Sequence, residues 1–362
     1  MMKRIKIVFL SVFALTVTAA FLVSILYPIL SSNLSLNETS RNLMHEQGVA
    51  CASEIKDENV KLVIKPDFGV YSIAFSPDGK YIAAGGDHLK ACVWDVETGQ
   101  LMRTLNHNAV VQFVTYSPDG KYLATGTWDT YKVKNHETVN IWDAKTGNLI
   151  SSLSPTNKQY NAGVNSMSFS LDYKYLSVSY VGLGKSADIA MFDLNTMKLH
   201  KLLEDNRGAI SIKFSTNSKH LIYGNHKEEI CIHNIESNKC GDKISTGFKG
   251  WINGVDVSLN GKFIAAAGAD KIIKIWRLQT KETMQILRGH TGWIRAIAFS
   301  PDGRHLVSAG DDRTVMLWDI RTGQVVKILE GWHGIFSVTF SPDNKYFAAG
   351  GNERITIWTH TQ

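Results

Sequence analysis

A short turn sequence recurs seven times along this chain, and its spacing constrains the fold more than any other feature. Ser-Pro-Asp-Gly, or a degenerate form of it, precedes an apolar strand each time, and each unit ends in a strand that closes on an aromatic residue or His. Turn signals and short β-rich runs that repeat about every 42 residues predict four-stranded sheets. The turns begin at Ser76, Ser117, Ser170, Ser215, Ser258, Ser300 and Ser341.

Seven such sheets predict an all-β, seven-bladed β-propeller over residues 58–362. One four-stranded sheet cannot bury both of its faces, so the units must pack on one another around an axis. The sequence ends four residues after Trp358, which leaves the seventh unit without an outermost strand. The segment 58–66, ENVKLVIKP, is similar to the outer strands of other units. We therefore expect it to complete the seventh blade, which closes the ring and makes the region one domain.

The sixth unit carries a specific set of motifs. Gly289-His290, Ser300-Pro301-Asp302-Gly303, Asp312 and Trp318-Asp319 stand at the spacing of the WD-repeat family, which the chain resembles over residues 58–362. In that family a His, a Ser or Thr, an Asp and the Trp form a hydrogen-bonded structural tetrad within one blade. The resemblance assigns those places to His290, Ser308, Asp312 and Trp318. A catalytic triad is the alternative interpretation of the His, Ser and Asp, but their spacing matches the repeat.

The other units depart from this pattern. The fifth keeps Asp270 and Trp276 but has Gly250-Trp251 where Gly-His is expected. We expect these blades to depend more on apolar packing and to have lower local stability.

The N-terminal part of the chain predicts export or membrane anchoring. Residues 1–6 form a basic tip, and residues 7–30 form an apolar run of 24 residues without a charge. About 20 apolar residues cross a bilayer, whereas a cleaved signal peptide has only about 7–15. Lys3, Arg4 and Lys6 precede the run, which keeps the N-terminus in the cytoplasm and sends the propeller across. A single-pass signal-anchor is the favoured interpretation, and a cleaved signal followed by a secreted or periplasmic propeller is the alternative.

Residues 31–57 are polar, rich in Ser and Asn, and show no period. They predict a flexible stalk. Two glycosylation sequons begin at Asn33 and Asn37 and matter only in a eukaryotic secretory pathway. Half of the net charge of +6 comes from the basic tip, which argues against nucleic acid as a partner.

The repeats differ most at one position, five residues before each turn serine. The first, third and sixth preceding positions are apolar in every unit and predict the core, whereas the fifth is chemically mixed. In the WD-repeat family this position and the one two residues earlier face the upper opening, where partners bind. The earlier position holds Trp251 and Trp293, with Trp332 near it in the seventh unit, and indoles packed between blades are the alternative. The mixed position holds Tyr71, Gln112, Asn165, Ile210, Asn253, Arg295 and Phe336.

Units two and three are longer than the others, and we expect their extra residues to lie in loops on the same upper face. Long loops on a rigid scaffold commonly carry function, although neutral drift in loop length is an alternative. Loop residues expected to contact a partner are Tyr131, His136 and Tyr160. Trp128, Lys132, Lys134, Lys158, Tyr180 and Lys185 belong to the same extra residues.

No catalytic, metal-binding or cofactor-binding pattern is evident in the sequence. Lys213 and Asp256 stand two residues before their turn serines in adjacent units and predict a structural ion pair. Cys92 and Cys231 occupy equivalent strand positions and predict small core residues. Cys240 is expected too far along the hairpin to bridge to Cys231, and Cys51 lies in the stalk, where it could cross-link chains.

Together these patterns predict a membrane-tethered, non-enzymatic scaffold that binds a protein or peptide on its upper face. The predicted contacts are Trp251, Trp293, Arg295, Trp332, Phe336, Tyr71 and the loop residues above. Two other classes remain: an extracytoplasmic enzyme or small-ligand sensor that uses the central opening, and a cytoplasmic WD-repeat adaptor.

Overall fold

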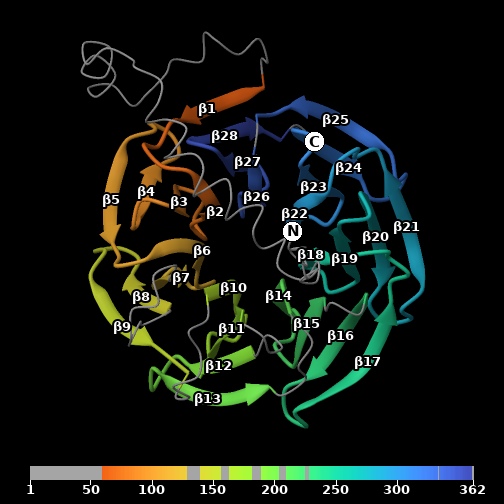
Figure 1. Cartoon of the computed structure of the whole chain (residues 1–362), viewed down its shortest axis with the longest axis horizontal. Helices are drawn as coiled ribbons and strands as arrows, with labels where there is room; N and C mark the ends of the chain where they lie inside the picture. The colour runs from red at the N-terminus through yellow and green to blue at the C-terminus, as the bar shows by residue number, and fades with distance from the viewer. Residues whose placement is uncertain are drawn as a thin grey trace, which may run out of the picture. The chain divides into compact units, whose positions relative to one another are not determined.

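The computed structural model describes residues 59–128, 139–155, 163–181, 189–203, 209–224, 228–332 and 334–360. These residues form seven four-stranded antiparallel sheets arranged around a central axis (Figure 1), so the predicted all-β, seven-bladed propeller is confirmed. The basic tip, the apolar run and the stalk lie outside them. Among the residues described, the structure contains no helix that is long and apolar enough to span a bilayer.

Each blade is numbered in chain order, from its inner to its outer strand. Blade one contains β2 (Val70–Phe75), β3 (Tyr81–Gly86), β4 (Lys90–Asp95) and β5 (Leu101–Asn106). Blade two contains β6 (Val110–Tyr116), β7 (Tyr122–Trp128), β8 (Val139–Asp143) and β9 (Leu149–Leu153). Blade three contains β10 (Gly163–Phe169), β11 (Tyr175–Val181), β12 (Ile189–Asp193) and β13 (Lys198–Leu203). Blade four contains β14 (Ile212–Phe214), β15 (His220–Gly224), β16 (Glu229–Asn234) and β17 (Lys239–Ser245).

The remaining three blades follow the same order. Blade five contains β18 (Ile252–Val257), β19 (Phe263–Gly268), β20 (Ile272–Arg277) and β21 (Thr283–Arg288). Blade six contains β22 (Ile294–Phe299), β23 (His305–Gly310), β24 (Thr314–Asp319) and β25 (Val325–Glu330). Blade seven contains β26 (Ile335–Phe340), β27 (Tyr346–Gly351), β28 (Arg354–Thr359) and, as its outermost strand, β1 (Val60–Ile64).

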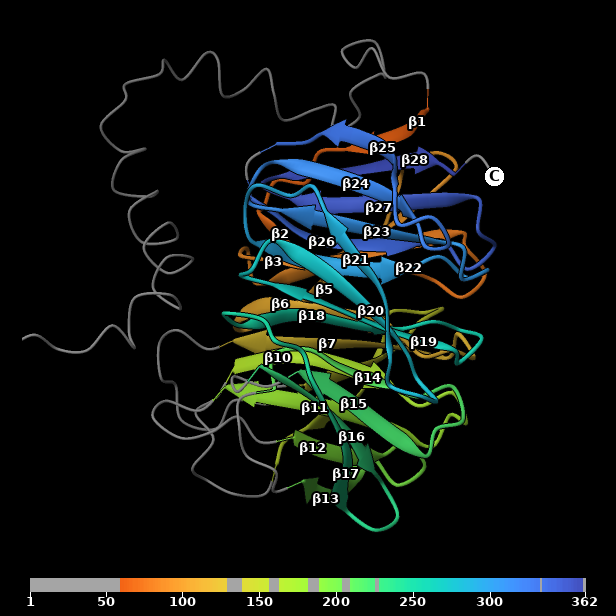
Figure 2. The ribbon, with the colours of Figure 1, turned by 90° about the vertical axis from the view of Figure 1, so that its right-hand side faces the viewer.

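The ring closes through the pairing of the first described strand with the last. β1 lies antiparallel to β28, with Val60 opposite Trp358 and Ile64 opposite Ile355. The predicted closing strand is therefore confirmed. Figure 2, which turns the ring by 90°, shows the sheets stacked face to face around it. Apolar side chains fill the space between neighbouring sheets, and the three positions predicted as core are buried in all seven blades.

The turn serines terminate the inner strands by an identical set of hydrogen bonds. Ser76 Oγ donates to Asp78 Oδ1 at 2.6 Å and accepts from the Tyr81 backbone N–H at 2.9 Å. The other six turns repeat both contacts, with Asn in place of Asp in blades four and five. These turns define the lower face of the ring, and the opposite end, where the inner strands begin, is its upper face.

A β-bulge lies near the start of the inner strand in six blades, at the chemically mixed position. In blade six, Ile294 pairs with Gly310 and Ala296 with Ala309, so Arg295 has no partner in the ladder. A bulged residue leaves the pairing and turns its side chain in a new direction. The same shift occurs at Tyr71, Gln112, Asn165, Asn253 and Phe336. All seven mixed residues, including Ile210 before the short β14, are half-buried.

Hydroxyl groups connect neighbouring inner strands across the seams between blades. The Ile212 backbone N–H of blade four donates to Ser166 Oγ of blade three at 3.2 Å, and Phe214 N–H donates to Ser168 Oγ at 3.1 Å. Ser337, Ser72 and Ser211 accept from blades one, two and five in the same way. An inner strand is a sheet edge, so these bonds satisfy donors that would otherwise remain unpaired.

One prediction about the cysteines is wrong. Cys231 and Cys240 form a disulfide, with their Cα atoms 5.8 Å apart. A register shift between Ile232 and His233 places Cys240 opposite His233, on the same face of the sheet as Cys231. Counting along the hairpin without this shift would place Cys240 nearer Ile235, too far from Cys231 for a disulfide. Cys92 is a buried free cysteine, as predicted.

Candidate functional site

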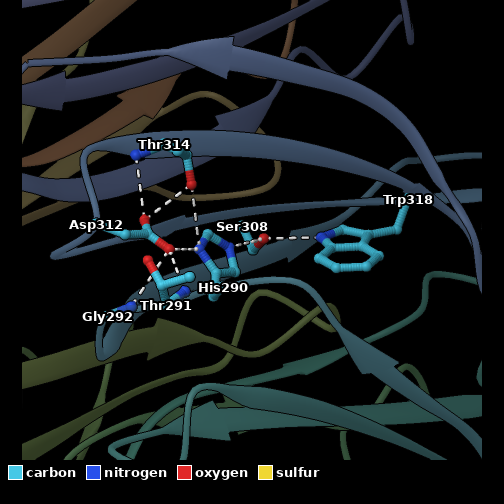
Figure 3. Close-up of polar contacts among 7 residues, drawn as sticks. All are labelled: His290, Thr291, Gly292, Ser308, Asp312, Thr314 and Trp318. Carbon is cyan, nitrogen blue, oxygen red and sulfur yellow. Dashed lines mark hydrogen bonds and ion pairs between the residues drawn. The ribbon is translucent and has the colours of Figure 1, made fainter.

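Blade six contains a continuous chain of hydrogen bonds among four side chains (Figure 3). His290 Nδ1 lies 2.8 Å from Asp312 Oδ2, and His290 Nε2 lies 2.7 Å from Ser308 Oγ. The Trp318 indole N–H donates to the same Ser308 Oγ at 2.8 Å. The structure thus brings together all four residues of the predicted structural tetrad.

Burial determines the charge state of this group and its access to solvent. Burial lowers the pKa of His290, against the opposing effect of the Asp312 carboxylate. Burial alone would raise the pKa of Asp312, but hydrogen bonds from Thr314, from His290 and from the Thr291 backbone N–H bring it below its ordinary value. A neutral imidazole that donates a hydrogen bond from Nδ1 to Asp312 accepts a hydrogen bond from the Ser308 hydroxyl at Nε2. Ser308 has no exposed surface, so it is not placed to act as a nucleophile, and the four side chains have a structural role within blade six.

The tetrad also holds a segment of the upper face in position. Asp312 Oδ2 accepts the backbone N–H of Thr291 at 2.7 Å and lies 3.4 Å from the N–H of Gly292. The residue that follows is Trp293, one of the predicted contact residues. The buried network therefore fixes the backbone from which an exposed candidate site residue projects.

Blade two contains a related network that sequence reasoning missed. His107 Nε2 lies 2.8 Å from Thr125 Oγ1, which also accepts the Trp142 indole N–H at 2.9 Å. Burial lowers the pKa of His107 to about 4, against the effect of the Leu105 carbonyl that its Nδ1 contacts. The signal was present, because His and Thr are 18 residues apart here, as His290 and Ser308 are in blade six.

Other blades place an apolar ring where His290 stands. Phe68 stacks on Trp94 in blade one, and Phe248 packs edge-on against Trp276 in blade five. The alignment of Gly250-Trp251 with Gly-His is therefore wrong, since Phe248 fills that place. Gly250-Trp251 corresponds instead to Gly292-Trp293.

Trp332 fills the same place in blade seven. Its ring stacks on Trp358 with the ring centroids 6.5 Å apart, while one side of it stays half-exposed. It lines an open cavity of about 380 Å³ together with Lys65, Asn352, Glu353 and Arg354. The Arg354 guanidinium carbon lies 4.9 Å from the centre of the Trp332 ring. Trp332 thus belongs both to the packing of the blade and to a surface hollow.

Trp293 and Arg295 form one unit on the upper face of blade six. The guanidinium of Arg295 lies over the Trp293 ring at 5.3 Å and makes two hydrogen bonds of 2.7 Å to the Asp311 carboxylate. A bidentate pair over an indole fixes the guanidinium in one orientation. Both Trp293 and Arg295 remain half-exposed.

Tyr71 and Phe336 meet across the seam between blades one and seven, in an edge-to-face contact with centroids 5.7 Å apart. Burial and the nearby Asp87 raise the pKa of Tyr71 to about 12, so its hydroxyl stays protonated. Trp251 is half-exposed at the start of β18 in blade five. The predicted contacts on blades one, five, six and seven thus lie at the upper ends of inner strands or in the residues just before them.

The predicted loop contacts Tyr131, His136 and Tyr160 lie outside the described residues. The prediction that Tyr180 lies among the loop residues is wrong. Its side chain is 1% exposed and belongs to the core between blades two and three. Trp128 is half-buried at the end of β7.

The inner strands carry the predicted ion pair. Lys213 Nζ lies 3.3 Å from Asp256 Oδ1, and Asp256 Oδ2 accepts the Phe299 backbone N–H at 2.8 Å. Asp256 therefore takes part in the seams on both sides of blade five. Within the described ranges, no three His, Cys, Asp or Glu side chains gather closely enough to hold a metal ion.

Comparison with known sequences agrees with this architecture. The family profile of the WD domain, G-beta repeat, matches residues 60–95, 99–131, 240–277, 281–319 and 323–359. The chain belongs to the WD40 family. The matched WD40 stretches cover blades one, five, six and seven and part of blade two, whereas residues 132–239 carry no match. Blade four lies in that interval except for most of β17; it has no Trp and holds the disulfide.

One curated relative is the transcriptional corepressor LEUNIG_HOMOLOG of Arabidopsis thaliana. It is 24% identical over 231 residues, which make up 63% of this chain and 27% of the relative. The chain thus spans about a quarter of the length of this relative.

Proposed function

We propose that this protein is a non-enzymatic scaffold that binds a protein or peptide partner on the upper face of its propeller. The observation that carries the proposal is the set of half-exposed Trp, Arg, Tyr and Phe side chains at or beside the bulged position. Such residues are the usual anchors of protein interfaces. WD40 propellers commonly bind proteins, and the Arabidopsis relative is named a corepressor, a regulatory role that agrees with binding.

We further propose that residues 7–30 tether the chain to a membrane and that the propeller lies on the extracytoplasmic side. The run of 24 uncharged residues after a basic tip supports this topology. The Cys231–Cys240 disulfide supports it independently, because structural disulfides persist in oxidising compartments and are rare in the cytosol.

The binding role is tested by photo-cross-linking in intact cells. A photo-cross-linking amino acid at Gln112, the half-exposed bulged residue of blade two, should give a discrete cross-linked product when the rest of the chain is native. Trp251→Ala with Trp293→Ala should reduce this product about thirtyfold, because truncating an interface aromatic costs about 1 kcal/mol or more for each residue. Leu259→Ala, on the exposed lower face, is the matched control. Equal yields from all three chains would contradict the proposal.

The topology is tested separately with a tag at the C-terminus. An external protease should digest the tag in intact cells while the chain sediments with membranes at full-length mass. A protected tag would instead favour the cytoplasmic adaptor.

A further inference from the structure

The carboxylates on the upper face of blades five and six are already engaged by the protein itself. Asp311 makes its bidentate pair with Arg295, and Asp312 holds His290 and the backbone before Trp293. Asp270 Oδ2 accepts the backbone N–H of Lys249 at 2.6 Å. Hydrogen bonds within the blades thus orient all three acidic groups, and Arg295 neutralises Asp311.

The basic side chains of the same surface are differently placed. Four exposed cations there pair with no carboxylate in the part of the chain that the structure describes. We call them the basic rim: Lys249, Lys271, Arg288 and Arg313. On the upper face of blades six and seven, Glu330 and Glu353 are the exposed carboxylates without such a pair among the described residues. The surface therefore has an excess of accessible positive charge around Trp251 and Trp293.

Two members of the basic rim stand at strained positions. Lys271 and Arg313 occupy the turn between the second and third strands of blades five and six, with φ of 64° and 65°. A left-handed conformation costs a non-glycine residue about 1–2 kcal/mol. The same turn position has a positive φ at Leu89, Glu228 and Glu353, so this conformation belongs to the repeat, and in blades five and six it carries an exposed cation.

The cavity on blade seven is also lined by basic side chains. Lys65 and Arg354 line it beside the Trp332 ring, with Asn352 as a further hydrogen-bond donor and Glu353 as its one carboxylate. Two cations and an amide beside a single carboxylate suit the carboxylate of a partner's Asp or Glu side chain.

We infer that the basic rim and the blade-seven cavity bind an acidic segment of a partner protein. Carboxylates of the segment pair with the basic rim, one carboxylate enters the cavity, and apolar residues pack on Trp251 and Trp293. The inference rests on the proposed scaffold function and names its class of partner. A protein segment is favoured over nucleic acid because half of the net charge of +6 lies in the N-terminal tip, outside the propeller.

Fluorescence anisotropy with defined probes tests the inference on the full chain in mild detergent. The probes are a labelled dodecapeptide of Asp, Glu and Leu, its Asn, Gln and Leu counterpart, and a single-stranded oligonucleotide of twelve thymidines. The acidic peptide should bind about tenfold more tightly than the amide peptide, and this advantage should fall steeply between 50 and 300 mM salt, as approximate conditions for screening exposed charges.

Matched charge removals locate the site. Lys271→Gln with Arg313→Gln should weaken binding of the acidic peptide about fivefold or more. Lys262→Gln with Arg304→Gln removes two exposed cations from the lower face and should leave binding unchanged. Thermal unfolding of both double variants verifies that each is folded before binding is compared.

Three results would overturn the inference: equal binding of the acidic and amide peptides, equal losses in both double variants, or tighter binding of the oligonucleotide. The scaffold role is judged apart from these, by the cross-linking at Gln112. If the cross-linked product depends on Trp251 and Trp293 but not on Lys271 and Arg313, the inference fails and the scaffold function stands.

Discussion

His107 makes the stability of the propeller sensitive to acid. Its pKa is about 4 in the folded chain, against an ordinary value of 6.5. Between these two pH values the unfolded chain binds a proton that the folded chain does not. The free energy of unfolding therefore falls as the pH falls from 6.5 to 4, by about 3 kcal/mol in total, and this loss is complete below the lower value.

His107→Phe should flatten this dependence, because Phe68 and Phe248 already fill the equivalent place in other blades. Denaturant unfolding at a series of pH values between 4 and 7 measures it. His88→Asn, at an exposed position, is the control and should keep the slope of the native chain. An unchanged slope in His107→Phe would show that the imidazole is not its source.

Tyr173 occupies a turn position that favours glycine. Its φ is 63°, and the equivalent residues in blades one, two, five and six are glycines with positive φ. Tyr173 is also 52% exposed, so it contributes little packing. Tyr173→Gly should therefore raise the free energy of unfolding by about 1 kcal/mol.

The reverse substitution, Gly120→Tyr in blade two, should lower stability by a similar amount. A Cβ at Gly120 would have its nearest neighbour at 4.0 Å, so backbone conformation and not a clash would be responsible. Chemical denaturation of both variants measures the pair. A loss of stability in Tyr173→Gly would mean that the tyrosine ring has a packing role after all.

Individual residues differed in how well their places could be predicted. His290 and Asp312 were predictable because the tetrad has fixed spacing in blade six. His107 was not recognised, since Thr125 and Trp142 are 17 residues apart where Ser308 and Trp318 are 10. The extra residues between Thr125 and Trp142 change this spacing, so a search with the blade-six spacing does not find the blade-two network.

Among the elements, the inner strands depend on the hydroxyls that cross their seams. Ser166→Ala removes the acceptor of the Ile212 N–H in a seam that is almost fully buried. An unpaired buried donor costs about 1–3 kcal/mol, so we expect a loss of about that size in the free energy of unfolding.

Ser177→Ala is the matched control for this loss. Ser177 has no exposed surface, and its hydroxyl has no hydrogen-bond partner among the residues that the structure describes. Its removal should be neutral or slightly stabilising in the same denaturation experiment. Equal losses in both variants would mean that the effect comes from the lost atom and its cavity, and not from the bond across the seam.

Strand positions were predictable because alternating apolar residues and turn serines mark them along the chain. Register was not, because it depends on which residue faces which across the ladder. The bulges at Arg295 and Phe336 and the shift that joins Cys231 to Cys240 all arise from pairing. The chemically mixed position five residues before each turn serine was therefore predictable from the sequence. The bulge that explains its mixed chemistry was not.

At the scale of the whole molecule, the state of the cysteines reports where the propeller matures. Protein from its native compartment, alkylated under denaturing conditions before reduction, should yield the peptides of Cys231 and Cys240 linked to each other. Cys92 should be alkylated in the same sample, because it is a free thiol in the structure, and it serves as the internal control. Peptide mass spectrometry measures both. Full alkylation of Cys231 and Cys240 would favour a reducing compartment.

The pairing of β1 with β28 has a mechanical consequence. Everything before Asn59 joins the propeller through β1, and β1 belongs to the same sheet as the last strand of the ring. Tension applied to the N-terminal part of the chain is therefore carried first by the hydrogen bonds between these two strands. If they yield, the seventh blade loses its outermost strand and the ring loses the strand pairing that joins its two ends. The bulged residues of β22 and β26 keep their own ladders.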